Sequence, residues 1–119
     1  MTPPSDANAP KSALLPGTLD MLVLRTLSLG SLHGYGIAAH IEQLSEGALR
    51  VEQGSLYPAL ERLQNAGMVA SKWGKTTTGR RARYYTITAR GEKQLGKEIS
   101  AFDNLLVAIS RVLGRASEA

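Results

Sequence analysis

The hydrophobic period of the chain changes at Gly67, and this change constrains the fold more than any other feature. Before Gly67, apolar side chains recur every three or four residues, a spacing that places them on one face of a helix. After it, the segments MVASKW and ARYYTIT carry the β-branched and aromatic residues typical of strands. The basic segment GKTTTGRR lies between them, so the pattern predicts a β-hairpin with a long, exposed, cationic tip.

Three helices are expected before this change, over residues 18–29, 36–45 and 55–65. Thr18 is a suitable N-cap for the first helix, and Asp20 would then lie in its first turn, where the helix dipole favours an acid. Gly47 and Gly67 are expected to end the second and third helices, because glycine adopts the left-handed conformation common after a helix C-terminus.

Three helices followed by a hairpin form the plan of a winged helix-turn-helix, a mainly α fold with a small β-hairpin wing (α+β). In this plan the third helix enters the DNA major groove. The wing reaches along the phosphates or into the minor groove. The expected organisation is a flexible N-terminal arm, a winged helix-turn-helix DNA-binding domain, a C-terminal dimerisation helix and a flexible tail, over residues 1–13, 14–88, 89–114 and 115–119.

The charge of the hairpin supports an anionic partner. The chain as a whole has a net charge of +4, which is weak evidence, but residues 72–91 contain six cations and no acid. Such a block repels itself unless an anion neutralises it. A solvated loop is the alternative interpretation, and the strand signals on either side favour the anion-binding one. Lys75, Arg80 and Arg81 are the expected phosphate contacts, with hydroxyl groups from Thr76, Thr77 and Thr78.

The outward face of the third helix suits a DNA groove. Arg62 can pair with a guanine edge or a phosphate, and Asn65 can pair with adenine. Ser55 and Tyr57 can offer hydroxyl groups to phosphate. With Ser55 as the N-cap, Pro58 would lie in the first turn, where no intrahelical N–H bond is lost. An ordinary amphipathic helix with a solvated face is the alternative, and the cationic hairpin that follows favours DNA.

The C-terminal segment carries an apolar stripe with no evident partner in its own chain. Its spacing of 4-3-4-3-4 extends over nearly three heptads, as in a coiled coil. The first helix is apolar nearly all round and needs cover on two sides. Both features predict a homodimer rather than an intramolecular cover helix. The expected interface residues are Leu19, Leu22, Leu95, Ile99, Phe102, Leu106, Ile109 and Leu113.

Three segments resemble the signature segments of PadR-type transcriptional regulators: HGYGI (33–37), GSLYPALERLQNAGMV (54–69) and RRARYYTITARGEKQL (80–95). The similarity covers residues 14–113, and the length resembles the short members with one C-terminal dimerisation helix. The resemblance implies a homodimeric winged-helix repressor that a small effector releases. It also implies that Tyr35, Ser55, Tyr57, Pro58 and the wing match DNA-contacting regions.

Together these arguments predict one set of DNA contacts on a double-stranded, pseudo-palindromic operator. For a two-fold dimer the half-sites should lie about one helical turn, roughly 34–36 Å, apart. The candidate contacts are Tyr35, Gln53, Ser55, Tyr57, Pro58, Arg62, Asn65, Lys75, Thr76, Thr77, Arg80 and Arg81.

The aromatic residues do not predict a drug pocket, although the sequence leaves a small aromatic effector open. In some drug-sensing members of the PadR family a tryptophan of the C-terminal helix stacks on the ligand. Here the only tryptophan, Trp73, falls in the first strand and is expected to pack against Tyr84 or Tyr85 at the base of the hairpin. Phe102 is the only aromatic residue of the last helix and is expected to serve as core.

Nothing in the sequence predicts catalysis, a metal or a cofactor. His33 and His40 lack metal-ligand spacing, and they are interpreted as a loop residue and a surface helix residue. The absence of cysteine, of a signal peptide and of a long apolar run predicts a cytoplasmic protein. A winged-helix module for protein–protein contact without DNA readout is the alternative function, and the cationic wing argues against it.

Overall fold

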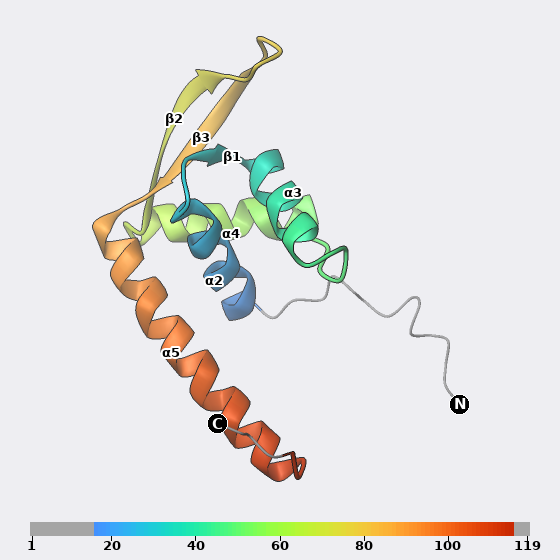
Figure 1. The fold of residues 1–119 in the computed structure, drawn as a ribbon. Helices are drawn as coiled ribbons and strands as arrows, with labels where there is room; N and C mark the ends of the chain where they lie inside the picture. The colour runs from blue at the N-terminus through green and yellow to red at the C-terminus, as the bar shows by residue number, and fades with distance from the viewer. Residues whose placement is uncertain (1–15, 116–119) are drawn as a thin grey trace.

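The computed structural model describes residues 16–115 and contains four helices and a small antiparallel sheet (Figure 1). The fold class predicted from the sequence is confirmed: three helices precede a β-hairpin, and a long helix follows it. In chain order the elements are α2 (Pro16–Leu27), β1 (Leu32–His33), α3 (Gly34–Leu44), α4 (Gln53–Asn65), β2 (Val69–Lys75), β3 (Arg81–Ile87) and α5 (Ala89–Val112). The predicted arm and residues 116–119 of the predicted tail lie outside the described residues.

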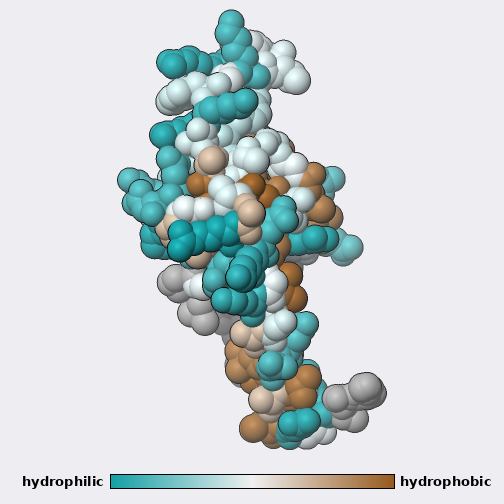
Figure 2. Space-filling model, turned by 90° about the vertical axis from the view of Figure 1, so that its left-hand side faces the viewer, coloured by the Kyte–Doolittle hydropathy of each residue, from teal (hydrophilic) through white to brown (hydrophobic). Residues whose placement is uncertain are grey.

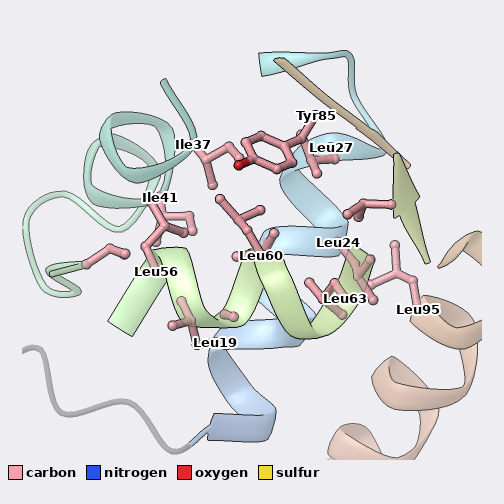
Figure 3. Close-up of a cluster of buried hydrophobic side chains, with 14 residues drawn as sticks. Leu19, Leu24, Leu27, Ile37, Ile41, Leu56, Leu60, Leu63, Tyr85 and Leu95 are labelled. Carbon is pink, nitrogen blue, oxygen red and sulfur yellow. The ribbon is translucent and has the colours of Figure 1, made fainter. Parts of the chain in front are cut away.

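The core lies where α2, α3, α4 and the base of the sheet meet (Figure 3). Leu56, Leu60 and Leu63 of α4 point into it and are 1%, 1% and 4% exposed, which confirms the predicted inward face of this helix. They meet Leu24 of α2 and Ile37 of α3, both fully buried. Since burial of one such side chain stabilises a fold by about 1.5–3 kcal/mol, this contact fixes α4 on the other helices.

The sheet has the strand order β1-β3-β2, with both pairs antiparallel. The register of the hairpin pairs Val69 with Ile87 and Lys75 with Arg81, so β2 and β3 are matched over their whole length. The third strand, β1, was not predicted, because two residues are too few to show a period. It pairs with the edge of β3 through Leu32 and Tyr85.

The start of α5 is fixed closely to the base of the wing. Thr88 caps the helix by accepting the Gly91 N–H at 3.1 Å, and its hydroxyl donates to the Gly67 carbonyl at 2.7 Å. A Cβ at Gly91 would collide with the Met68 carbonyl oxygen and lie 2.8 Å from Ile87 Cγ1. Glycine therefore lets α5 begin directly against the turn between α4 and β2.

The C-terminal half of α5 extends away from the body of the protein (Figure 1). The radius of gyration is 16.3 Å, larger than the roughly 13 Å of a compact 100-residue domain. Figure 2 shows apolar side chains gathered at this end of the molecule, opposite the wing. The exposed apolar stripe of α5 and its C-cap consists of Ile99, Phe102, Leu105, Leu106, Ile109, Val112 and the C-cap Leu113, which are 38–87% exposed.

Two residues of the predicted dimer interface belong to the core of the chain itself. Leu19 is 4% exposed and Leu95 is 7% exposed, and both pack in the central cluster (Figure 3). That part of the prediction is corrected, because side chains buried within one chain are not available to another. Leu22 is half-buried beside the same cluster. The periodicity was right, but it did not show where α5 leaves the domain.

Two predicted helix starts are also corrected. α2 is described over Pro16–Leu27, so Thr18 lies inside the helix and is not its N-cap, and Asp20 lies beyond the first turn of this range. α4 begins at Gln53 after Glu52, so Ser55 is not its N-cap. Pro58 consequently lies in the helix interior, where it removes one intrahelical hydrogen bond.

The helix C-termini predicted from the sequence agree with the structure better than the predicted helix starts do. Gly67 follows α4 with φ +77, and the Met68 N–H bonds to the Leu63 carbonyl at 2.9 Å, as in a Schellman motif. At the end of α3 the left-handed position is shared: Glu46 has φ 54 and Gly47 has φ +83. No helix within residues 16–115 is long and apolar enough to cross a membrane.

Candidate nucleic-acid interface

An open cleft of about 870 Å³ lies between the wing and the N-terminal ends of α3 and α4. One wall consists of residues of α3 and α4, and the other consists of residues of the wing. The cleft brings together most of the predicted DNA contacts, namely Tyr35, Gln53, Tyr57, Thr76, Thr77, Arg80 and Arg81. These residues are up to 46 positions apart in the chain, so the fold, not sequence proximity, gathers them.

The helical wall of the cleft depends on a close contact between α3 and α4. The Tyr57 ring lies against Gly34, and a Cβ at Gly34 would lie 2.7 Å from Tyr57 Cζ and collide with the hydroxyl oxygen. Tyr57 nevertheless remains 43% exposed, and Tyr35 beside it is 73% exposed. Both rings thus lie at the rim of the cleft with their hydroxyl groups available to a phosphate.

The start of α3 is capped by His33, which is therefore not a loop residue as predicted. It pairs with Tyr84 in the sheet, and its Nδ1 accepts the Gly36 N–H at 3.0 Å. The ring also lies edge-on to Tyr84, with 5.3 Å between centroids, and lines the cleft.

The loop before α4 is held by α3. Glu42 of α3 accepts the Val51 N–H at 3.0 Å through its Oε2. Val51 itself is 7% exposed and belongs to the core. These two contacts fix the chain directly before Gln53, where α4 begins. Since the first N–H groups of a helix have no intrahelical partner, this end of α4 can bind an anion.

Three cations of the wing share one of its faces. The strand register places Lys75, Arg81 and Arg83 on the same face as the buried Tyr85, which turns toward the helices. Burial raises the pKa of Tyr85 above its ordinary 10.0, against the smaller opposing effect of Arg83, so its hydroxyl stays protonated. The opposite face carries Lys72 and Tyr84, and the Tyr84 ring lies 3.1 Å from the Cβ position of Gly74.

The tip of the wing is an ordered turn. The Thr76 N–H donates to the Arg80 carbonyl at 2.8 Å, and the Gly79 N–H donates to the Thr76 carbonyl at 2.9 Å. The Thr76 hydroxyl accepts the Arg80 N–H at 3.2 Å and lies 3.0 Å from the Thr78 hydroxyl. Thr76 therefore shapes the tip, while Thr77 and Arg80 are exposed beside it.

Trp73 does not pack against Tyr84 or Tyr85, and that prediction was wrong. In the register it lies across from Arg83. The Arg81 guanidinium lies over the indole at 4.5 Å from the ring centroid, and that of Arg83 lies at 5.7 Å. The tyrosines are occupied elsewhere, because Tyr85 is part of the core and Tyr84 faces the other side of the wing.

Arg62 lies in an ion pair instead of in the cleft. Its Nη2 donates to Asp20 Oδ1 at 2.8 Å, which joins α4 to α2. Burial raises the pKa of Asp20 above its ordinary 3.8, although the hydrogen bond and charge of Arg62 lower it. The effect of burial on the pKa of Asp20 is thus larger than the opposing effect of Arg62, and the ion pair joins α4 to α2.

The other candidate contacts lie outside the main cleft. Asn65 lines a smaller hollow of about 240 Å³, together with Tyr57, Glu61 and Arg83. Ser55 and Pro58 are exposed on α4, and Lys75 is exposed near the end of β2. Arg83, Trp73 and His33 line the cleft but were not predicted contacts. The alternation of Arg83 with the buried Tyr85 was the available signal for the first of them.

No group of three metal-ligating side chains occurs among residues 16–115. His40, interpreted from the sequence as a surface residue, is half-buried on α3. Its Nε2 is buried and has no hydrogen-bond partner within the described part of the chain.

The side chains that line the cleft offer cations, hydroxyl groups and aromatic rings, which suit a phosphate backbone.

The sequence model described as "Transcriptional regulator PadR-like family" matches residues 23–97. The chain belongs to this family. The matched residues run from α2 through the wing to the buried start of α5, so the family segment contains every element that lines the cleft. As a PadR-like protein, the chain is a transcriptional regulator with the winged-helix fold of its relatives.

Solved structures share this PadR-like fold. A transcriptional regulator from Clostridium thermocellum is 27% identical, with a TM-score of 0.74 over 80% of this chain and 92% of that one. A PadR-like transcriptional regulator from Bacillus cereus is 25% identical, with a TM-score of 0.72 over 86% of this chain and 97% of that one. An uncharacterized 37.1 kDa protein in transposon TN4556 of Streptomyces fradiae is 40% identical over 85 residues, or 71% of this chain and 23% of that protein.

Proposed function

We propose that this PadR-like regulator binds double-stranded DNA in the cleft between α4 and the wing. The observation that carries the proposal is the common face of Arg81 and Arg83, which line the cleft opposite the exposed start of α4. A phosphate backbone in the cleft would neutralise these cations and meet the hydroxyl groups of Tyr35 and Tyr57. The remaining exposed face of α4 would then enter the major groove.

We propose further that the DNA-binding form is a homodimer. The exposed apolar stripe of α5 supports this, because monomeric proteins rarely expose so continuous an apolar face. A groove of about 360 Å³ between α2 and α5 adds to it, with Met21, Phe102 and Leu105 in its walls. Two copies joined along α5 would present two wings to a pseudo-palindromic operator. Repression, and release by a small effector, are the regulatory outcome that we propose for this dimer.

Duplex binding by charge-matched variants tests the proposal. The duplex is one that the wild-type chain selects from a random-sequence pool, labelled for fluorescence anisotropy. The double variant R80A/R81A should weaken binding at least tenfold and make the log–log salt slope shallower by about 0.9 for each phosphate that the variant no longer neutralises. The control K93A/K97A removes the same charge from exposed positions on α5 and should leave the slope unchanged.

Two results would contradict the proposal. Equal losses of affinity in both double variants would mean that net charge, not the cleft, drives binding. Wild-type binding that does not depend on salt would favour the alternative of a protein–protein module. The dimer is tested separately by sedimentation velocity, where a monomer at micromolar concentration would rule out the two-half-site arrangement.

A further inference from the structure

Trp73 is a large aromatic residue that the core does not use. It lies in the middle of β2 and is 55% exposed, and it is absent from the buried cluster of the domain. Its ring instead carries two guanidinium groups, those of Arg81 at 4.5 Å and Arg83 at 5.7 Å from the centroid. All three side chains line the cleft. The indole is therefore a support for cations on the DNA-facing side of the wing.

Two hydrogen bonds connect Arg83, and through it the Trp73 ring, to α4, the helix expected to enter the major groove. The Ser71 hydroxyl of β2 donates to Gln64 Oε1 of α4 at 3.0 Å. The Arg83 Nε of β3 donates to the same Ser71 hydroxyl, also at 3.0 Å. Gln64, Ser71 and Arg83 thus join α4, β2 and β3, and Arg83 continues the connection to Trp73.

We propose that Trp73 is a positioning residue for DNA binding: it holds the Arg81 and Arg83 guanidiniums in the cleft, and the Gln64–Ser71–Arg83 hydrogen bonds keep this support in a fixed position relative to α4. The inference rests on the proposed DNA-binding function of the cleft. In this arrangement the wing and the recognition helix meet DNA as one rigid unit, and their contacts have a fixed separation along the duplex.

The physical advantage is the conformational entropy of arginine. A free arginine side chain loses up to about 2 kcal/mol of rotamer freedom when it is fixed on a phosphate. Stacking on the indole restricts Arg81 and Arg83 before DNA arrives, so less freedom is lost on binding. Because Trp73 is more than half exposed, its removal should change DNA affinity more than the stability of the fold.

The test compares the DNA affinity of the wild-type chain with that of W73A and W73F, on a duplex selected by the wild-type chain. Two exposed cation–π contacts are each equivalent to a factor of about two to five, so W73A should bind at least about fourfold more weakly. W73F keeps an aromatic face and should recover most of the affinity. In the background R81A/R83A, W73A should have no further effect, since Trp73 acts through these arginines.

The outcomes separate this inference from the proposed function. A wild-type chain that binds no duplex would overturn the proposed function itself. If the wild-type chain binds, and W73A loses the same factor with and without Arg81 and Arg83, Trp73 contacts DNA directly and the positioning role is wrong. Wild-type affinity in W73A would contradict it as well.

A measurement without DNA tests the connection to α4. Trp73 is the only tryptophan of the chain, so intrinsic fluorescence reports on this residue alone. In S71A, Arg83 loses its anchor, and acrylamide should quench Trp73 more strongly than in the wild-type chain. S71T retains the hydroxyl group and should restore the wild-type quenching. Equal quenching in all three proteins would show that Ser71 does not hold the support.

Discussion

Gly91 and Gly96 lie in the same helix but in opposite surroundings, and alanine substitution should separate them. At Gly91 an added Cβ would collide with the Met68 carbonyl oxygen and lie 2.8 Å from Ile87 Cγ1. At Gly96 no atom lies within 4 Å of the Cβ position. The close approach at Gly91 involves backbone, which no side-chain rotation can relieve. The base of the wing and the start of α5 would have to move apart.

The expected changes in the free energy of unfolding follow from these surroundings. Replacing glycine by alanine within a helix is favourable by about 1 kcal/mol where space is open, so G96A should raise the free energy of unfolding by about that amount. Forcing a methyl group into a packed site costs about 1–3 kcal/mol, and the backbone collision places G91A at the upper end. After the same helix gain, G91A should lower the free energy of unfolding by about 2 kcal/mol.

Thermal unfolding, monitored by circular dichroism, measures the difference in stability between G91A and G96A. The two variants should differ by about 3 kcal/mol, which corresponds to a difference of more than about 10 °C in Tm for a domain of this size. All samples need one protein concentration, because association makes Tm depend on concentration. A G91A protein as stable as G96A would refute the close approach of α5 to the wing base.

Substitutions at three further positions test the start of α3 and the ion pair between α2 and α4. G34A should leave the fold intact but displace the flexible end of the Tyr57 side chain, so duplex affinity should fall several-fold in anisotropy while Tm changes little. H33A removes the cap of α3 and should lower the free energy of unfolding in urea by about 1 kcal/mol, whereas H33N, with a good capping side chain, should not. Burial raises the pKa of Asp20, so the folded state binds a proton there more tightly than the unfolded chain. The contribution of Asp20 to stability should therefore be most favourable below its unfolded pKa of about 3.8 and be lost as the pH rises through the raised folded value. D20N should abolish this pH dependence and change stability at pH 7 by less than about 1 kcal/mol, although it removes the ion pair with Arg62.

The leucine period of α4 was predictable from the sequence because the helix has one buried face. Leu56, Leu60 and Leu63 recur at helical spacing, and the structure buries all three. The alternation after Gly67 likewise predicted the hairpin, since Tyr85 turns to the core. Both predictions depend on local periodicity alone, which a single sequence contains.

The incorrect predictions for Arg62, Trp73 and Leu95 have one cause, which is that local periodicity does not show how elements pack. Arg62 pairs with Asp20, which is 42 positions away, and Trp73 pairs with arginines of the next strand. Such partners are set by how elements pack, and spacing along the chain does not encode them. Leu95 shows the same limit, because its position in the 4-3-4-3-4 spacing of the C-terminal segment did not reveal that it is buried in the core of its own chain.

The fluorescence of Trp73 during titration with duplex DNA tests the central claim most directly. The residue lines the cleft and is the only tryptophan, so its emission reports whether DNA enters there. If the cleft binds DNA, the emission should change in step with anisotropy, and bound DNA should protect Trp73 from acrylamide. DNA binding that is clear in anisotropy but leaves both the emission and the acrylamide quenching unchanged would contradict the account.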